Sequence, residues 1–547
     1  MSSSSSTSTG IPRELVKKRW LGFLIWQSIA SAVLHLPNSI FFLRQHPSPS
    51  SPAAVFLLSF LAFHLSLLLL SLALFIVVSP HPDPSASLPE LAAASFRYLL
   101  KALVGGFSRP SFTAHFSLRA RRSLVSVLFL LICSAAGSLI LLGICGLPQV
   151  LDLASLVDIG LRGVVFGLVY CLHYIYRKRW VLNFPIIQRP LFYSFKVGLS
   201  SALKRAFKLS VQTHVWSFII ILLLPDQFKT INMIGEFMVQ QIRFYIGTLI
   251  ASICWEISHH LLQVVHTRRC MLAPPKGSVV AERNPSDFLL ESLEQDNSHL
   301  IQYLAYLDLC IVSESNAESW RRAAIFEQTG ETYKRVINVC LKPLEQLISR
   351  LAEGFEGLSI DNSDCLSKQL NSPLDVKTDL SLHEAFNDFQ KCSWCARSLG
   401  ALTARSHSED RYGVAQLTGC NKAVVTTLLS CLLAVEACLG KKTCAPSAHL
   451  LGAANIRWAT FNAGKGYETF AVATKRKKPL LYAKAYALAD VVRTSLYQIV
   501  SAFEIDMQAN ARNSVLEKNW INDGKPLYGT REILVYKLHL FLEYRAI

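Results

Sequence analysis

The stretch Ala53–Ser79, AAVFLLSFLAFHLSLLLLSLALFIVVS, decides the fold class because its only ionisable side chain is His64. A helix needs about 20 apolar residues to cross the ~30 Å hydrocarbon core of a bilayer. The stretch therefore predicts a membrane-spanning helix. Two further runs have the same character, Trp20–Leu43 and Ser123–Leu147.

Three less apolar runs complete a predicted set of six spans. They are Gly160–Tyr176, Leu209–Pro225 and Phe244–Val265. Ionisable residues inside spans are candidates for function. We expect Asp158 to pair with Arg162 four residues later, since residues at this spacing share a helix face. Glu256 is expected to pair with His259 or His260, and His64 to be neutral and hydrogen bonded.

The composition of the 547-residue chain supports a membrane protein. Half of it (51%) is hydrophobic and only 17% is charged, against about 25% in soluble domains. The formal net charge of +17 is compatible with binding to nucleic acid, with an anionic surface or with membrane topology. Residues 1–270 contain 24 basic and 8 acidic residues, and residues 271–547 contain 31 and 30. The excess charge therefore lies in the apolar half, which disfavours nucleic-acid binding.

The loop charges alternate along this half. Lys and Arg are concentrated in residues 13–19, 97–122, 177–208 and 268–283, and are sparse in the intervening loops. Cytosolic loops of membrane proteins carry the excess of Lys and Arg. The alternation predicts six spans with both termini on the cytosolic side.

Two of the basic segments mix cations with apolar residues at helical spacing. They are Pro89–Phe107 and Ile187–Lys208. Such helices can lie among the headgroups and bind anionic lipid, or they can pack on the cytosolic ends of the spans. The candidate lipid contacts are Arg189, Lys196, Lys204, Arg205 and Lys208.

The second half of the chain predicts an α-helical cytosolic domain. Its hydrophobic periodicity is helical throughout and gives no strand pattern. The fold class is therefore all-α, a six-span domain followed by a cytosolic helical domain. The predicted parts are a tail at 1–19, the spans at 20–265 with basic loops at 80–122 and 177–208, a helical lobe at 266–355, a linker at 356–378 and a second lobe at 379–547.

The sequence contains no pattern typical of catalysis or of a cofactor, such as GxGxxG, a phosphate loop, HExxH or GxSxG. Cys392 and Cys395 form a lone CxxC pair, for which His383 and Cys420 are the candidate partners in a zinc site. Packing as small hydrophobic side chains is the favoured alternative. We predict no enzyme activity, no cofactor, no metal and no structural disulfide.

Three local strings resemble the nuclear-division-cycle transmembrane nucleoporin family. Leu182–Gln188, LNFPIIQ, is similar to the family's FPII-Q segment after the fourth span. Ile301–Leu309, IQYLAYLDL, resembles its YLA-x-x-DL helix, and Ser408–Gln416, SEDRYGVAQ, its EDR-aromatic-GV-x-Q motif. The family-motif residues are Phe184, Pro185, Ile186, Ile187, Tyr303, Leu304, Asp308, Glu409, Asp410, Arg411, Tyr412 and Gly413.

These motif residues also have structural interpretations. We expect Ser408 to cap a helix that begins with Glu409 and Asp410, since acidic residues favour a helix N-terminus. Gly413 would allow close helix packing, with Tyr412 in the neighbouring groove. Phe184-Pro185 would redirect the chain after the fourth span.

The resemblance implies a structural membrane protein of the nuclear pore. It implies that the spans lie in the pore membrane of the nuclear envelope and support pore assembly. It also implies partners, namely membrane lipid, an aladin-like WD-repeat protein, a membrane-bending scaffold nucleoporin with an RRM domain and other pore membrane proteins, with no direct binding to nucleic acid. The alternative is a membrane enzyme or transporter of the endoplasmic reticulum with Glu256, His259 and His260 between spans.

Overall fold

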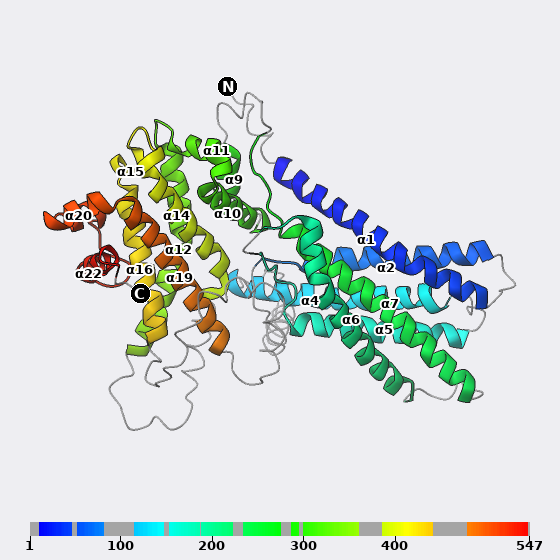
Figure 1. The fold of residues 1–547 in the computed structure, drawn as a ribbon. Helices are drawn as coiled ribbons and strands as arrows, with labels where there is room; N and C mark the ends of the chain where they lie inside the picture. Colours follow the sequence, from blue (N-terminus) through cyan, green and yellow to red (C-terminus); the bar gives the residue numbers. More distant parts are fainter. Residues whose placement is uncertain are drawn as a thin grey trace, which may run out of the picture. The chain divides into compact units, whose positions relative to one another are not determined.

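The computed structural model of the chain consists of two compact units, residues 1–268 and 269–547 apart from a few residues near 463 (Figure 1). It describes residues 10–45, 52–80, 114–146, 153–185, 188–222, 234–274, 286–294, 299–359, 385–440 and 478–544. Within these ranges the structure is helical, with one isolated β-bridge between Ser79 and Val181. The all-α prediction is confirmed.

The first unit is a bundle of long helices. They are α1 (Gly10–Gln45), α2 (Pro52–Val77), α4 (Ala114–Leu141), α5 (Leu153–Tyr176), α6 (Leu191–Leu222) and α7 (Ile234–His266), with a π-helical turn η1 (Leu142–Gly146) after α4. Each helix packs against the next in sequence, and α7 returns to pack against α1. All six predicted spans coincide with these helices.

The predicted amphipathic segment and the predicted fifth span are not separate elements. Both belong to α6, which runs without a break from Leu191 to Leu222. The other basic segment, Pro89–Phe107, lies outside the described residues.

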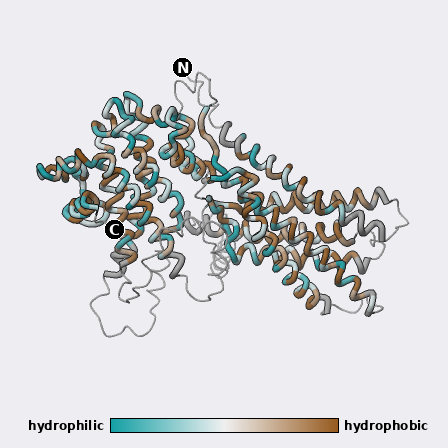
Figure 2. Tube along the Cα trace, in the orientation of Figure 1, coloured by the Kyte–Doolittle hydropathy of each residue, from teal (hydrophilic) through white to brown (hydrophobic). Residues whose placement is uncertain are grey.

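The long helices of the first unit consist largely of hydrophobic residues along their length (Figure 2). Large hydrophobic side chains point outward from every long helix of this unit. On α2 they are half exposed or nearly so at Leu57, Leu61, Leu65, Leu68 and Leu72. An exposed apolar surface of this extent is unfavourable in water and favourable in lipid. The first unit therefore has the surface of a membrane domain.

Glycines bring α4 and α5 into close contact. A Cβ atom on Gly167 would lie 2.1 Å from the carbonyl oxygen of Cys133, and one on Gly163 would lie 2.3 Å from Cα of Ser138. Gly137 on α4 faces Gly163 in the same way. Small residues four apart let helix backbones approach closely in membranes, where packing rather than exclusion of water holds helices together.

Among the described residues, six helices are long and apolar enough to cross a membrane. Five lie in α1, α2, α4, α5 and α7, and match predicted spans. The sixth is Cys420–Leu439 in the second unit, and two thirds of its apolar stretch is buried. The described part of α6, which ends at Leu222, is not among the six.

The second unit is built around four long helices, α12 (Glu331–Ser359), α14 (Phe389–Glu409), α16 (Cys420–Gly440) and α19 (Lys478–Ala502). The helix α10 (His299–Glu314) packs on α14, and α12 packs on both α14 and α16. Shorter elements surround this core: α9 (Asp287–Glu294), η4 (Asn316–Glu318), α11 (Ser319–Ala323), η5 (Ala324–Phe326), η6 (Phe386–Asp388), α15 (Val414–Leu417), α20 (Glu504–Arg512), α21 (Leu516–Trp520) and α22 (Arg531–Leu542).

The α4–α5 contact yields a stability prediction. Gly167→Ala should lower the stability of the full-length protein by about 1–3 kcal/mol, because the added methyl group forces the two backbones apart. The measurement is thermal unfolding of the detergent-solubilised protein, followed by size-exclusion chromatography.

Gly160→Ala on the same helix is the matched control, since a Cβ atom there meets nothing within 4 Å. Alanine favours a helix over glycine by about 1 kcal/mol, so this variant should be neutral or more stable. Equal unfolding temperatures for the two variants would contradict the close-packing assignment.

Candidate functional site

The connection from α5 to α6 is folded onto the ends of α2 and α7. The Ser79 amide donates to the carbonyl of Trp180 (3.1 Å), and the Leu182 amide donates to the carbonyl of Ser79 (3.1 Å). Lys178 has a positive φ of 50°, which turns the chain into this bridge. Phe184 is buried. The turn at Lys178 and this bridge thus redirect the chain after α5, and the role expected for Phe184-Pro185 stays a prediction.

Side-chain amides fix the same segment to α7. The backbone amide of Asn183 donates to Oε1 of Gln263 (3.3 Å). In turn, Nε2 of Gln263 donates to the carbonyl of Val181 (3.4 Å). Nε2 of Gln188 donates to the carbonyl of Thr267 (3.4 Å). Pro185 is partly buried, and Ile186 and Ile187 lie outside the described residues.

A buried carboxylate lies at the centre of this end of the bundle. Glu256 on α7 is 1% exposed and accepts two bonds from the Arg179 guanidinium, of 2.6 and 2.7 Å. It accepts a third bond from Nε of Arg205 on α6, at 3.1 Å. One side chain therefore joins the α5–α6 connection, α6 and α7.

The expected pairing of Glu256 with a histidine is wrong. His259 contacts Arg179 through Nδ1 (3.0 Å), and its Nε2 lies 3.3 Å from the Arg179 carbonyl. Nε2 of His260 lies 3.0 Å from the carbonyl of Phe195. His259 thus positions Arg179, and His260 contacts the backbone of α6. Arg179, and not a histidine, pairs with the Glu256 carboxylate.

Other arginines bind the free carbonyls of helix ends at the same end of the bundle. Arg19 on α1 donates to the carbonyls of His266 (3.1 Å) and Arg268 (2.8 Å), where α7 ends. Arg122 on α4 donates to the carbonyl of Val77 at the end of α2 (2.9 Å). The last carbonyls of a helix lack intrahelical partners, so these contacts satisfy groups that lipid could not.

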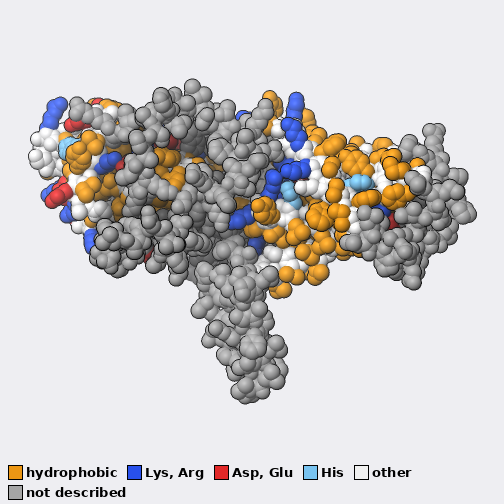
Figure 3. Space-filling view, turned by 90° about the horizontal axis from the view of Figure 1, so that it is seen from below, with side chains coloured by type: hydrophobic (Ala, Val, Ile, Leu, Met, Phe, Trp, Pro, Cys, Tyr) orange, Lys and Arg blue, Asp and Glu red, His pale blue; other side chains and the backbone are white. Residues whose placement is uncertain are grey.

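These contacts place alternate ends of successive helices in one layer. The amino-terminal halves of α1, α4 and α6 meet the carboxyl-terminal ends of α2, α5 and α7 there. Described arginines from three of the basic segments, Arg19, Arg122 and Arg179, thus lie at one end of the first unit. Figure 3 shows Lys and Arg side chains collected toward one end of its apolar surface.

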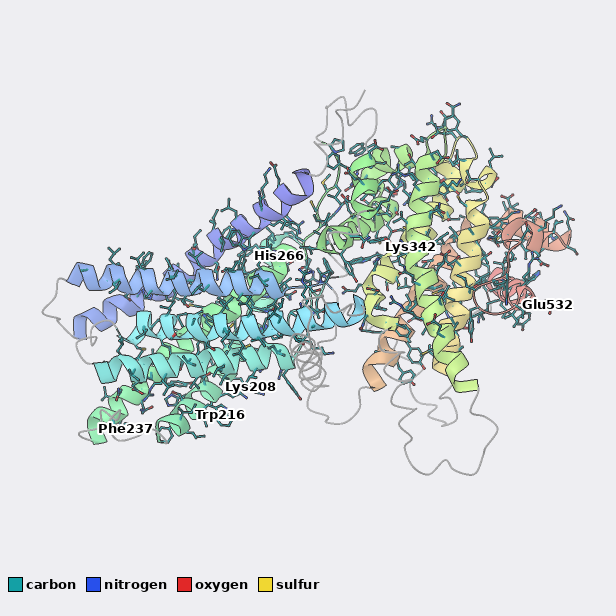
Figure 4. All side chains as sticks on the ribbon, turned by 180° about the vertical axis from the view of Figure 1, so that it is seen from behind. Lys208, Trp216, Phe237, His266, Lys342 and Glu532 are labelled. Carbon is teal, nitrogen blue, oxygen red and sulfur yellow. The ribbon has the colours of Figure 1, made fainter. Side chains whose placement is uncertain are left out.

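The candidate lipid contacts divide into two kinds. Arg189, Lys196, Lys204 and Lys208 are exposed. Arg205 turns inward to Glu256, and Ser201 accepts a bond from its NH1 (3.2 Å). Its contact with lipid stays a prediction. Lys208 and Trp216 mark the basic and the apolar parts of α6 in Figure 4.

A second buried ion pair lies within α5, in its amino-terminal half. Nε of Arg162 contacts Oδ1 of Asp158 at 3.1 Å, which confirms the predicted pair. Arg162 also donates to Oε1 of Gln241 (3.1 Å) and lies 3.9 Å from the ring centroid of Phe244. The hydrogen-bonded state expected for His64 stays a prediction, since its buried Nδ1 has no hydrogen-bond partner among the described residues and its ring packs on Phe60.

In the second unit, Asp308 of the YLAYLD string is fully buried and binds two arginines. Its Oδ2 accepts from Arg321 (2.7 Å), and its Oδ1 accepts from Nε of Arg269 (2.8 Å). The Leu272 amide donates to it as well (3.1 Å). Glu318 completes the network with bonds to both arginines. Asp308 thus fixes the segment 269–272 onto α10 and α11.

The adjacent Arg322 connects this region to the EDR string. It donates two bonds to Glu409, of 2.7 and 2.6 Å, and further bonds to the carbonyls of Val312 and Ser315. Arg322, with Arg405, holds the pKa of Glu409 below its usual value. Arg321 and Arg322 were missed in the sequence, where nothing marks two neighbouring cations as buried.

The expected helix start at Ser408 is wrong. Ser408 and Glu409 form the last turn of α14, and Asp410 is its C-cap. Asp410 then accepts bonds from the amides of Tyr412 (3.2 Å) and Ala415 (2.8 Å), so it stabilises the turn into α15.

The roles expected for the next two residues are also wrong. Gly413 has φ +65°, and a Cβ atom there would meet nothing within 4 Å. The glycine is needed for the turn and not for close packing. Tyr412 is 54% exposed rather than placed in a groove. Arg411 is also exposed.

The remaining candidates are buried in the core of the second unit. Tyr303 donates to Oδ1 of Asp388 (3.0 Å), and Leu304 packs in the interior. Burial raises the pKa of the Cys392 and Cys395 thiols. Cys395 contacts Cys340, and within the described residues no group of three or more ligands could hold a metal ion. His383 lies outside those residues.

The cysteines of the described residues are free and buried, and none forms a disulfide. Burial in packed helices accounts for their positions.

Comparison with known families gives one match. The model of the family described as Nucleoporin protein Ndc1-Nup matches residues 159–356 and 366–507. The chain belongs to this family. The match covers α5 to α7 and most of the second unit, so it includes Glu256, Asp308 and Glu409. No curated protein matches the chain.

Membership of the Ndc1-Nup family gives the apolar bundle a biological setting. A nucleoporin with membrane-spanning helices is a membrane-anchored component of the nuclear pore. The family is structural, and the buried ion pairs of this member serve its architecture.

The Glu256 site yields a stability prediction for this Ndc1-Nup protein. Glu256→Gln should cost about 3–5 kcal/mol, since it leaves Arg179 buried without a counter-charge. Thermal unfolding of the full-length protein in detergent measures the loss. Removing both charges, in Glu256→Gln/Arg179→Gln, should restore part of the stability.

Glu14→Gln is the matched control because Glu14 is exposed on α1. It should unfold like the wild type. A Glu256→Gln protein as stable as Glu14→Gln would show that the cluster does not hold the bundle together.

The turn after α14 yields a second prediction. Gly413→Ala should destabilise the protein by about 1–2 kcal/mol, because an L-residue pays that cost in the left-handed region. Asn tolerates this region better, so Gly413→Asn should lose less. Circular dichroism of the purified protein during heating compares the two, and equal losses would indicate a steric role instead.

Proposed function

We propose that this chain is a structural anchor that holds the nuclear pore scaffold in the pore membrane and supports pore assembly. The first unit spans the bilayer, and the second unit binds soluble nucleoporins. The observation that carries the proposal is the layer of bonded arginines at one end of an otherwise apolar bundle. That pattern is typical of a polytopic domain whose basic end faces the cytosol.

We infer that α6 contains the remaining span of the first unit, the predicted fifth. The apolar helix α16 belongs instead to the soluble core of the second unit. From Arg205 to Leu222, α6 rises about 25 Å at 1.5 Å per residue, close to the ~30 Å of a hydrocarbon core. Val211, Val215 and Trp216 point outward along this part. By contrast, α16 is packed among α12, α19, α21 and α22, which explains its apolar composition.

The proposed topology has both termini on the cytosolic and pore side. The arginine layer would face that side, and the Asp158–Arg162 pair would lie toward the lumen. The exposed Arg189, Lys196, Lys204 and Lys208 would lie along the headgroups or project beyond them.

The second unit offers a surface for partners at the turn that Asp410 stabilises. Tyr412 is 54% and Leu417 84% exposed, and both lie on a turn fixed by hydrogen bonds. Exposed aromatic and aliphatic side chains on a rigid element are typical interface anchors. The partners proposed from the resemblance are an aladin-like WD-repeat protein, a membrane-bending RRM scaffold nucleoporin and other pore membrane proteins.

The enzyme or transporter hypothesis loses its basis at Glu256. The carboxylate accepts three bonds from arginines, and His259 is held between Arg179 and its backbone. Both groups are engaged in structural contacts.

Localisation and capture of partners test the proposal together. The full-length protein with a C-terminal fluorescent tag should form a punctate nuclear rim. Tyr412→Ala/Leu417→Ala should retain the rim signal and co-purify about tenfold less scaffold nucleoporin, as expected for losing about 1.4 kcal/mol of binding energy.

Tyr536→Ala, which removes an exposed aromatic residue on α22, is the control and should co-purify partners normally. A reticular signal without a nuclear rim would contradict the anchor function. Normal capture by the double variant would contradict only the assignment of this surface.

A further inference from the structure

We propose that the junction of α5 and α6 is a binding site for the phosphate of an anionic phospholipid. The site, called here the cationic junction, consists of Arg177, Lys204, Arg205 and Lys208. The inference rests on the proposed membrane insertion of the first unit. It specifies the phosphate of an anionic phospholipid as the ligand, and it adds Arg177, which lies outside α6.

The first argument is the charge balance at Glu256. One carboxylate faces two guanidinium groups, Arg179 and Arg205. Arg179 alone satisfies both carboxylate oxygens, so one positive charge on Arg205 is not compensated. The Arg205 side chain is 25% exposed, so the uncompensated charge is accessible to an external anion.

The second argument is that further cations surround this charge. Lys204 and Lys208 are one turn apart on α6 and flank Arg205, and both are exposed. Arg177 and Arg179 lie in the connection after α5, and Arg179 meets Arg205 of α6 at Glu256. Cations from the connection and from α6 thus meet in one place.

The third argument is the position of the junction on the bundle. Leu172 on α5 is 60% and Phe207 on α6 is 55% exposed, and the outward face of α6 continues into Val211 and Val215. A molecule bound there would place an anion against the cations and an apolar body against the helices. Basic pockets between membrane helices on the cytosolic side bind anionic headgroups in this way.

The test measures retained lipid. The full-length protein is reconstituted in phosphatidylcholine vesicles containing phosphatidylinositol, re-extracted, washed in detergent and analysed for lipid by mass spectrometry. The wild type should retain phosphatidylinositol in excess over its share of the vesicles. Each substitution in Arg177→Gln/Lys204→Gln/Lys208→Gln should reduce the excess about fivefold, the equivalent of about 1 kcal/mol per cation.

Lys334→Gln/Lys342→Gln/Lys525→Gln is the matched control, since it removes three exposed cations from the second unit. Lys342 is labelled in Figure 4. The control should retain lipid like the wild type. Equal losses in the two triple variants, or no enrichment by the wild type, would overturn the proposal.

Two further measurements separate the remaining explanations. Washing with inorganic phosphate should remove no more lipid than chloride of equal ionic strength, and greater removal would assign the site to free anions instead. The junction variant should still reach the nuclear rim, so a loss of lipid selectivity with normal localisation is distinguishable from failure of the anchor function.

Discussion

The architecture of the first unit depends on the ion pair between Glu256 and Arg179. Charged groups are costly to remove from water, and a buried pair is tolerated only when its geometry and hydrogen bonds are nearly complete. Here the carboxylate accepts three bonds, and the guanidinium also contacts His259. Because Arg179 lies in a connection and not in a helix, the pair fixes the entire turn between α5 and α6.

The same physical constraint explains the other arginines of this layer. The last carbonyls of a helix have no intrahelical partners, and here donors from other helices satisfy some of them. Arg19 supplies the donor for α7 and Arg122 for α2. Arginines whose charge indicates the cytosolic side thus also donate hydrogen bonds to helix ends. In each case the arginine belongs to a different helix from the end that it binds. This arrangement ties neighbouring helices together.

The helices could be predicted from the sequence, and most of their contacts could not. Apolar length marks the spans because the bilayer fixes the number of residues required. The Asp158–Arg162 pair was predictable because its members are one helical turn apart. Arg179 and Glu256 are 77 residues apart, and Arg322 and Glu409 are 87 apart. Nothing local distinguishes Arg179 from the exposed Lys178 beside it, so only the packing of the bundle selects the buried cation.

Under the proposed insertion, α6 is one continuous helix with two environments. The part after Arg205 lies in lipid, and the part before it lies among or beyond the headgroups. From Leu191 to Arg205, α6 rises about 21 Å, and only about 5–8 Å of headgroup region separates hydrocarbon from water on each side. If Arg205 lies at the hydrocarbon boundary, an upright α6 extends past the headgroups together with the end of α7. This projecting part is held by Gly198, whose missing side chain leaves room for the His260 ring. Under the proposed insertion, α6 would present rigid helix beyond the headgroups, and Lys204 beside Arg205 would lie at the hydrocarbon boundary.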